Sequence, residues 1–221
     1  MRPYAVLGAG SVGSAIAAYL ARSGHPVHVA ARAPHAEAIA AQGGIRAISR
    51  SETFLAPVQA GTRLPEHLPD GTILFLTVQA PDVDQALEEA GMLCRNHPVV
   101  TWQNGIRSEA VAAPRCPRLY GGIVRFTATS LVPGEVRLRQ PGQLILGNHP
   151  EGADSLAREM ADDLGRAGFT AAVSPEIRVE KALKLLVNLV SGPAVLVSRT
   201  GPERAVAAAP APPRRRRKAS W

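Results

Sequence analysis

Short apolar runs alternate with Ala-rich or amphipathic stretches along most of the chain. The apolar runs predict strands at 4–7, 27–31, 72–78, 99–102, 120–129 and 143–146. The stretches between them predict helices from the end of a glycine-rich turn to about residue 23, and at 36–41, 82–90 and 154–167. Strands that alternate with helices favour an α/β fold with a doubly wound, mainly parallel sheet. Residues 132–135 (Val-Pro-Gly-Glu) predict a hairpin turn between two strands, so we expect antiparallel strands late in the sheet.

A different pattern covers residues 177–190, which are apolar nearly all round a helix. Lys181, Lys184 and Asn188 fall on one narrow stripe of it, at i, i+3 and i+7. We expect a largely buried helix that offers an ammonium group to a cleft, where it could act on an oxygen that gains negative charge. Lys181, one turn before Lys184, is the second candidate for that role. The alternative is the solvated polar stripe of an ordinary amphipathic helix.

Composition narrows the class of protein. The 221 residues are 46% hydrophobic and 19% charged, which is typical of a folded globular chain. The net charge is +7, but residues 203–221 contribute five of these charges, so we expect no specific nucleic-acid partner. Cys94 and Cys116 lack metal-ligand spacing, and none of the six histidines has a ligand or nucleophile partner by spacing, so we expect no metal and a cytoplasmic protein with reduced thiols. The most apolar run has 13 residues and is interrupted, too short for a membrane span of about 20.

The first predicted strand ends in a glycine motif that precedes a helix and a second strand, and this order predicts a Rossmann-type dinucleotide site. Gly8 would allow the tight turn, Gly10 the approach of a pyrophosphate, and Gly13 close packing of the helix on the sheet. The phosphates would lie at the helix N-terminus, where backbone N–H groups favour anions. The candidate cofactor residues of the motif are Gly8, Ala9, Gly10, Ser11, Val12 and Gly13. The alternative is a glycine-rich turn without a ligand.

The end of the second predicted strand favours NADP over NAD. An NAD site usually has an acid there for the ribose 2′-hydroxyl, but no Asp or Glu occurs before Glu37. Arg32 could instead pair with a 2′-phosphate through a charge-assisted hydrogen bond. The alternative is an ordinary surface arginine.

Together these stretches resemble the ketopantoate reductases (2-dehydropantoate 2-reductases), a family that reduces a 2-keto acid with NADPH on the route to pantothenate. The matching segments follow the order of the family and cover about residues 4–198: they are 5–13, 29–32, 76–80, 101–105, 127–134 and 180–193. The resemblance extends through a nucleotide domain into the first helix of a helical second domain.

The resemblance implies roles for individual residues. The glycine motif would bind the pyrophosphate, and Arg32 and Gln79 the 2′-phosphate region, although the family usually has Lys at the position of Gln79. Asn104 would contact the nicotinamide ribose and the substrate carbonyl. Lys184 would be the catalytic lysine that protonates the ketone oxygen, and Asn188 would contact the substrate. Gly192 replaces a usual Asn, which removes one expected substrate contact.

From the resemblance we expect a Rossmann domain at 1–170, the start of an all-α substrate domain at 171–201, and a disordered Ala/Pro/Arg tail at 202–221. The expected activity is NADPH-dependent reduction of 2-dehydropantoate to pantoate, with a second copy of the chain as a candidate partner. We expect low activity, because the resemblance stops near residue 199 and further substrate contacts of the family would be missing. The alternatives are an NADP-dependent reductase of another small 2-keto acid and a non-catalytic NADP-binding protein.

Overall fold

The fold is described by a computed structural model, which covers residues 1–198, with side chains described up to residue 189. The chain forms two compact units, Met1–Ala182 and a second that begins at Leu183. The predicted tail at 202–221 lies outside the described residues.

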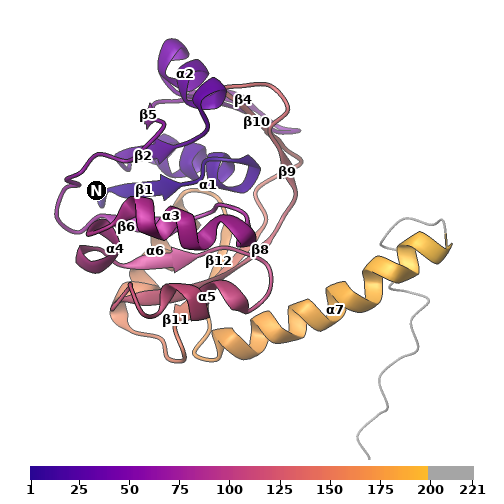
Figure 1. The fold of residues 1–221 in the computed structure, drawn as a ribbon. Coiled ribbons are helices and arrows are strands. Elements are labelled where there is room, and N and C mark those ends of the chain that lie inside the picture. Colours follow the sequence, from indigo (N-terminus) through magenta and orange to yellow (C-terminus); the bar gives the residue numbers. More distant parts are fainter. Residues whose placement is uncertain (199–221) are drawn as a thin grey trace, which may run out of the picture. The chain divides into compact units, whose positions relative to one another are not determined.

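Among the described residues, the main sheet has eight strands in the order β12-β11-β8-β7-β6-β1-β2-β5 (Figure 1). All neighbours are parallel except β8 and β11, which are antiparallel, so the mainly parallel sheet with late antiparallel pairing is confirmed. The strands are β1 (Tyr4–Leu7), β2 (Val27–Ala30), β5 (Gln59–Gly61), β6 (Ile73–Leu76), β7 (Val99–Thr101), β8 (Leu119–Arg125), β11 (Gln143–Asn148) and β12 (Thr170–Val173).

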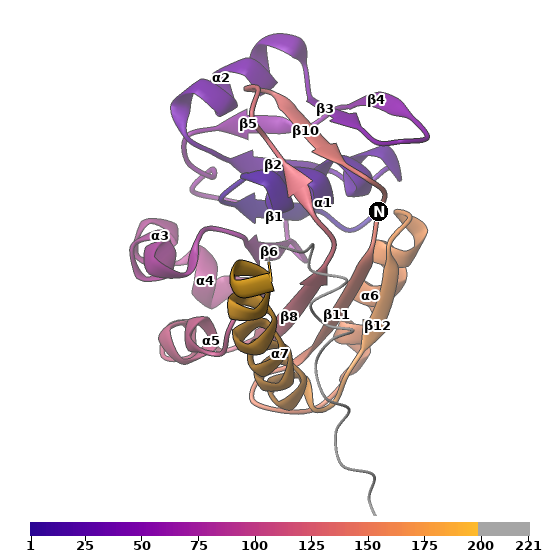
Figure 2. The same cartoon turned by 90° about the vertical axis from the view of Figure 1, so that its right-hand side faces the viewer.

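Helices cover both faces of this sheet (Figure 2). One face carries α1 (Ser11–Arg22) and α6 (Ser155–Arg166), and the other carries α3 (Val83–Ala90), α4 (Leu93–Asn96) and α5 (Arg107–Ala112). Successive strand residues point to opposite faces. Tyr4 and Phe75 are therefore buried in the core under α1 and α6, whereas Ala5 and Leu74 are buried under α3 and α5.

In the same part of the chain, four short strands form a second sheet in the order β4-β3-β10-β9. These are β3 (Ile45–Ile48), β4 (Thr53–Ala56), β9 (Ala128–Thr129) and β10 (Glu135–Leu138), and the sheet packs against α1. The predicted hairpin turn is confirmed: β9 and β10 are antiparallel, and the Glu135 N–H donates to the Val132 carbonyl at 3.1 Å. The single strand predicted at 120–129 is wrong, because the chain leaves the main sheet after Arg125 and joins the second sheet at Ala128.

The helix predicted at 36–41 begins earlier, as α2 (Ala33–Gln42), with Pro34 in its first turn. Proline is tolerated there because the first N–H groups of a helix have no intrahelical partner. A single 3₁₀ turn, η1 (Ala80–Asp82), leads from β6 into α3. Helix α2 and the turn η1 both follow the carboxyl ends of strands, β2 and β6. Ligands bind at this edge of doubly wound sheets.

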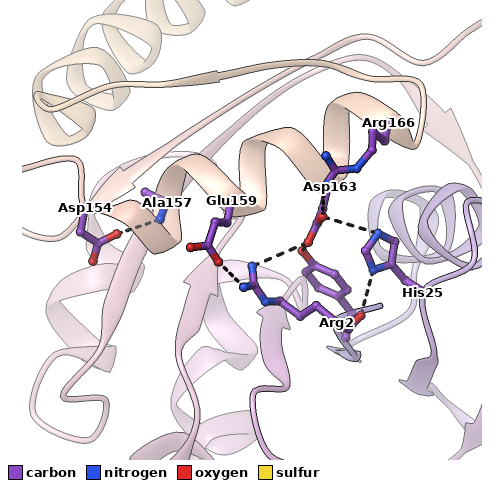
Figure 3. A network of polar contacts seen from close by, with 8 residues as sticks. Arg2, His25, Asp154, Ala157, Glu159, Asp163 and Arg166 are labelled. Carbon is purple, nitrogen blue, oxygen red and sulfur yellow. Dashed lines mark hydrogen bonds and ion pairs between the residues drawn. The ribbon is translucent and has the colours of Figure 1, made fainter.

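A polar network fixes the opposite edge of the main sheet (Figure 3). The Tyr4 hydroxyl donates to Asp163 Oδ2 at 2.7 Å, and Arg166 donates to Oδ1 at 2.5 Å. Burial raises the pKa of Tyr4, and the Asp163 carboxylate raises it further, so the hydroxyl stays a donor. Arg2 contacts Glu159 of α6. These contacts tie the first residues of the chain to α6. They lie at the edge opposite the carboxyl ends of the parallel strands.

The long helix α7 (Ile177–Ser198) begins in the first unit and continues into the second. Ile177 is buried with Ile123 and Ile145. Leu183, Leu186 and Leu189 are more than half exposed, so the expectation of a largely buried helix is wrong for this stretch, where the apolar side chains face solvent. Within the described residues, no helix is both long and apolar enough to cross a membrane.

Candidate functional site

The glycine turn after β1 is held between β1 and the end of β6. Gly8 has φ +97°, and a Cβ there would lie 2.6 Å from the backbone N of Val78. A Cβ on Gly13 would lie 2.4 Å from Thr77 Oγ1, so only glycine allows α1 to pack this close. Thr77 Oγ1 donates to the Gly8 carbonyl at 2.8 Å. Both glycines therefore serve the packing of the turn.

Gly10 differs, because a Cβ on it would have no described atom within 4 Å. It is exposed and is the N-cap residue of α1, and no described side chain caps this helix start. The N–H groups of the first turn lack intrahelical partners and carry the positive end of the helix dipole. The open space at Gly10 therefore fits a phosphate group, as a dinucleotide pyrophosphate would require.

A cavity of about 860 Å³ opens at this turn. Six of the sequence-predicted cofactor residues line it: Gly8, Ala9, Gly10, Ser11, Arg32 and Gln79. The others, Val12, Gly13 and Asn104, are not among its lining residues. Further walls come from α3, from His35 of α2, and from the β9–β10 turn, which contributes Ser130, Leu131 and Pro133. Sequence analysis predicts a turn at 132–135 but does not place it at the nucleotide site.

The charge of the cavity wall is mixed. Among the described residues that line it, Arg32 is the only Lys or Arg, and its side chain is exposed at the N-cap of α2. Gln79 is exposed at the start of η1, and Asp82 and Glu89 line the same cavity. Among the described lining residues, a single guanidinium is thus available for an anionic group, and two carboxylates line the same cavity.

Asn104 lies exposed in the turn after β7, and its neighbour Gln103 fixes this turn. The Gln103 amide donates to the carbonyls of Leu76 and Val78, both at 2.9 Å. The turn is therefore tied to the end of β6, just before Gln79. Sequence reasoning missed this role of Gln103, since its two acceptors are backbone atoms about 25 residues earlier in the chain.

The polar stripe of α7 has members in different environments. Lys181 is only 3% exposed and forms an ion pair with Glu109 of α5, whose Oε1 also accepts a hydrogen bond from Thr101 at 2.6 Å. Burial lowers the pKa of Lys181, and the Glu109 carboxylate opposes this shift. Lys184 is half-buried and Asn188 is exposed, and both belong to the second unit. The Lys181 ammonium group is thus held in a buried ion pair that joins α7 to α5.

No group of three or more His, Cys, Asp or Glu side chains among the described residues is arranged to hold a metal ion. Cys94 and Cys116 are free thiols, both buried under the helices of one sheet face.

A doubly wound sheet with a glycine-lined cavity at the carboxyl ends of β1, β2 and β6 is the architecture of Rossmann-type dinucleotide-binding folds. The family model "Ketopantoate reductase PanE/ApbA" matches residues 4–151. The chain belongs to the ketopantoate reductase family.

Individual relatives agree with this membership. The 2-dehydropantoate 2-reductase of Pyrococcus horikoshii is 31% identical over 188 residues, which cover 85% of this chain and 61% of the relative. The structure of 2-dehydropantoate 2-reductase from Geobacter metallireducens is 27% identical with a TM-score of 0.75, covering 90% of this chain and 66% of that one. A D-mandelate dehydrogenase structure with NADH and anilino(oxo)acetate is 25% identical with a TM-score of 0.77, covering 89% and 65%. The chain thus spans about 61% of the length of its curated relatives.

Proposed function

We propose that the chain binds NADPH in the cavity at the glycine turn and takes part in the reduction of a 2-keto acid, 2-dehydropantoate to pantoate. The observation that carries this proposal is the open space at Gly10 at the start of α1, with Arg32 on the wall of the same cavity. Membership in the ketopantoate reductase family, whose members are oxidoreductases acting on a CH–OH group, supports the reaction type.

In this proposal the residues divide into binding and proton transfer. When bound, NADPH supplies the hydride. The first-turn N–H groups of α1 hold the pyrophosphate, and Arg32 pairs with the 2′-phosphate beside Gln79. Asn104 orients the nicotinamide ribose and the substrate carbonyl. Lys184 donates a proton to the ketone oxygen, and Asn188 contacts the substrate. The pairing of Lys181 with Glu109 supports the choice of Lys184 over Lys181 as the proton donor.

A second candidate is the reduction of another small 2-keto acid. The likeness to a D-mandelate dehydrogenase, solved with NADH and anilino(oxo)acetate, supports this second candidate.

The cofactor preference is a separate matter. The presence of Gln79, Asp82 and Glu89 on the cavity wall favours a modest preference for NADPH over NADH. A cytoplasmic location and a dimer stay predictions.

The deciding experiment is NADPH oxidation, followed by absorbance, with 2-dehydropantoate and a panel of other 2-keto acids that includes phenylglyoxylate. We expect the highest kcat/KM with 2-dehydropantoate. A higher value with another acid would favour the second candidate. NADPH binding without turnover of any substrate would contradict both and favour a non-catalytic NADP-binding protein.

A further inference from the structure

His35 joins three segments that surround the candidate nucleotide cavity. It lies in the first turn of α2 and is half-buried. Its Nδ1 accepts a hydrogen bond from the backbone N–H of Gly134 at 2.9 Å, and its Nε2 lies 3.0 Å from Ser14 Oγ of α1. Ser14 Oγ in turn donates to the carbonyl of Ala9 in the glycine turn at 3.0 Å. Sequence analysis does not single this histidine out from the other five.

The hydrogen bonds determine where the protons lie. A backbone N–H can only donate, so Nδ1 of His35 must be the acceptor and carry no proton. The neutral ring then holds its proton on Nε2 and donates it to Ser14 Oγ, whose own proton goes to the Ala9 carbonyl. Each donor in this series of hydrogen bonds therefore has one acceptor. Burial lowers the pKa of His35, which favours the same neutral form.

The two segments that these hydrogen bonds connect both line the cavity. The glycine turn does so through Ala9, and the β9–β10 turn through Pro133. The turn between β9 and β10 has a further tie to α2, since Gln42 Nε2 donates to the Gly134 carbonyl at 2.7 Å. Gly134 has φ +79°, and a Cβ on it would lie 2.6 Å from Gln42 Nε2. Leu131 lies in the same turn, takes no part in these hydrogen bonds and is 90% exposed. The position of this wall therefore depends on contacts with α2 and with β3, whose Arg46 N–H donates to the same Gly134 carbonyl at 2.9 Å.

We propose that His35 is a positioning residue of the nucleotide site, which in its neutral form holds the β9–β10 turn and the glycine turn in place as two walls of the cavity. Both ring nitrogens of His35 are engaged with the protein, so its polar atoms act through these two walls, while the residue itself lines the cavity beside them. This inference rests on the proposed binding of NADPH.

Three substitutions separate the two hydrogen bonds. His35→Phe removes both. His35→Asn can keep an acceptor near the Nδ1 position for Gly134, and His35→Gln can keep a donor near the Nε2 position for Ser14. His67→Phe is the control, because His67 is exposed and does not line the cavity. The measurements are the Kd for NADPH and, without nucleotide, amide hydrogen exchange of segment 130–135.

We expect His35→Phe to weaken NADPH binding about tenfold and His35→Asn or His35→Gln about threefold, with no change for His67→Phe. Exchange at 130–135 should be fast in His35→Phe and His35→Gln and slow in His35→Asn and the unmutated protein. Unchanged NADPH affinity in His35→Phe, or equally fast exchange in His35→Asn, would overturn the inference. If His35→Phe fails to fold, Ser14→Ala, which removes the acceptor of His35 Nε2–H together with the link to Ala9 and keeps the bond to Gly134, should weaken binding about threefold, and unchanged affinity would again overturn it.

The test distinguishes this inference from the proposed function. Failure of the unmutated protein to bind NADPH would overturn the proposed function, and the role of His35 toward a nucleotide with it. NADPH binding that is insensitive to His35 would overturn the inference alone.

Discussion

At the residue scale, the proposed function assigns the preference for a phosphorylated ribose to Arg32, because no other Lys or Arg lines the described part of the cavity. A hydrogen bond to a charged group contributes about 1.5–3 kcal/mol, which corresponds to roughly 10–150-fold in affinity. We expect Arg32→Ala to weaken NADPH binding by this factor and leave NADH binding nearly unchanged. Titration with both cofactors measures this, with the exposed Arg139→Ala as control. Equal Kd values for NADPH and NADH in the unmutated protein would contradict the assignment.

Histidines also set a pH dependence of stability. Burial lowers the pKa of His35, His97 and His149 from the ordinary value of 6.5. The unfolded chain therefore binds more protons than the folded one near and below pH 6.5, so the free energy of unfolding should fall as the pH drops through this range. Urea unfolding at pH 8 and pH 5.5 measures this effect. His35→Asn should reduce the difference, since Asn does not titrate; a stability independent of pH over this range would refute the explanation.

At the element scale, the ion pair between Lys181 and Glu109 fixes the first turns of α7 to α5. Removing one partner of a buried pair leaves an uncompensated charge and costs about 3–5 kcal/mol. We expect Lys181→Met to lower the free energy of unfolding by this amount. The double variant with Glu109→Gln should recover much of the loss, because Gln can still accept from Thr101. Urea unfolding compares them with the exposed Arg178→Ala; equal losses in Arg178→Ala and Lys181→Met would argue against the pair.

How far the sequence predicts an element depends on the range of the interactions that form it. The β1–glycine turn–α1 unit was predictable, because its glycines serve packing within one short segment and against β6. Of the second sheet only the β9–β10 turn is predicted from the sequence; β3 and β4 are not, since β3 finds its parallel partner β10 about 90 positions later. Lys181 was placed on a polar stripe with Lys184, and its pairing with Glu109 depends on a contact across 72 positions.

At the scale of the whole molecule, nucleotide binding and proton transfer are assigned to different units. All described residues that line the cavity belong to the first unit, whereas Lys184 belongs to the second. We therefore expect Lys184→Ala to lower kcat about 10²–10⁴-fold while the Kd for NADPH stays nearly unchanged. Steady-state kinetics and NADPH titration of the same variant measure both, with Arg178→Ala as control. Full turnover in Lys184→Ala would exclude it as the proton donor.

The second sheet also has a consequence for how the chain reaches its native state. Its strands come from 45–56 and 128–138, so β3 emerges during synthesis long before β10 and must wait with one edge unpaired. Closing so long a loop carries an entropic cost, and non-local pairings of this kind slow folding. We expect this sheet to assemble last in refolding, with the contact between His35 and Gly134 among the latest to form. Stopped-flow refolding should then show NADPH binding only in the slowest phase, after the helical circular dichroism signal has recovered.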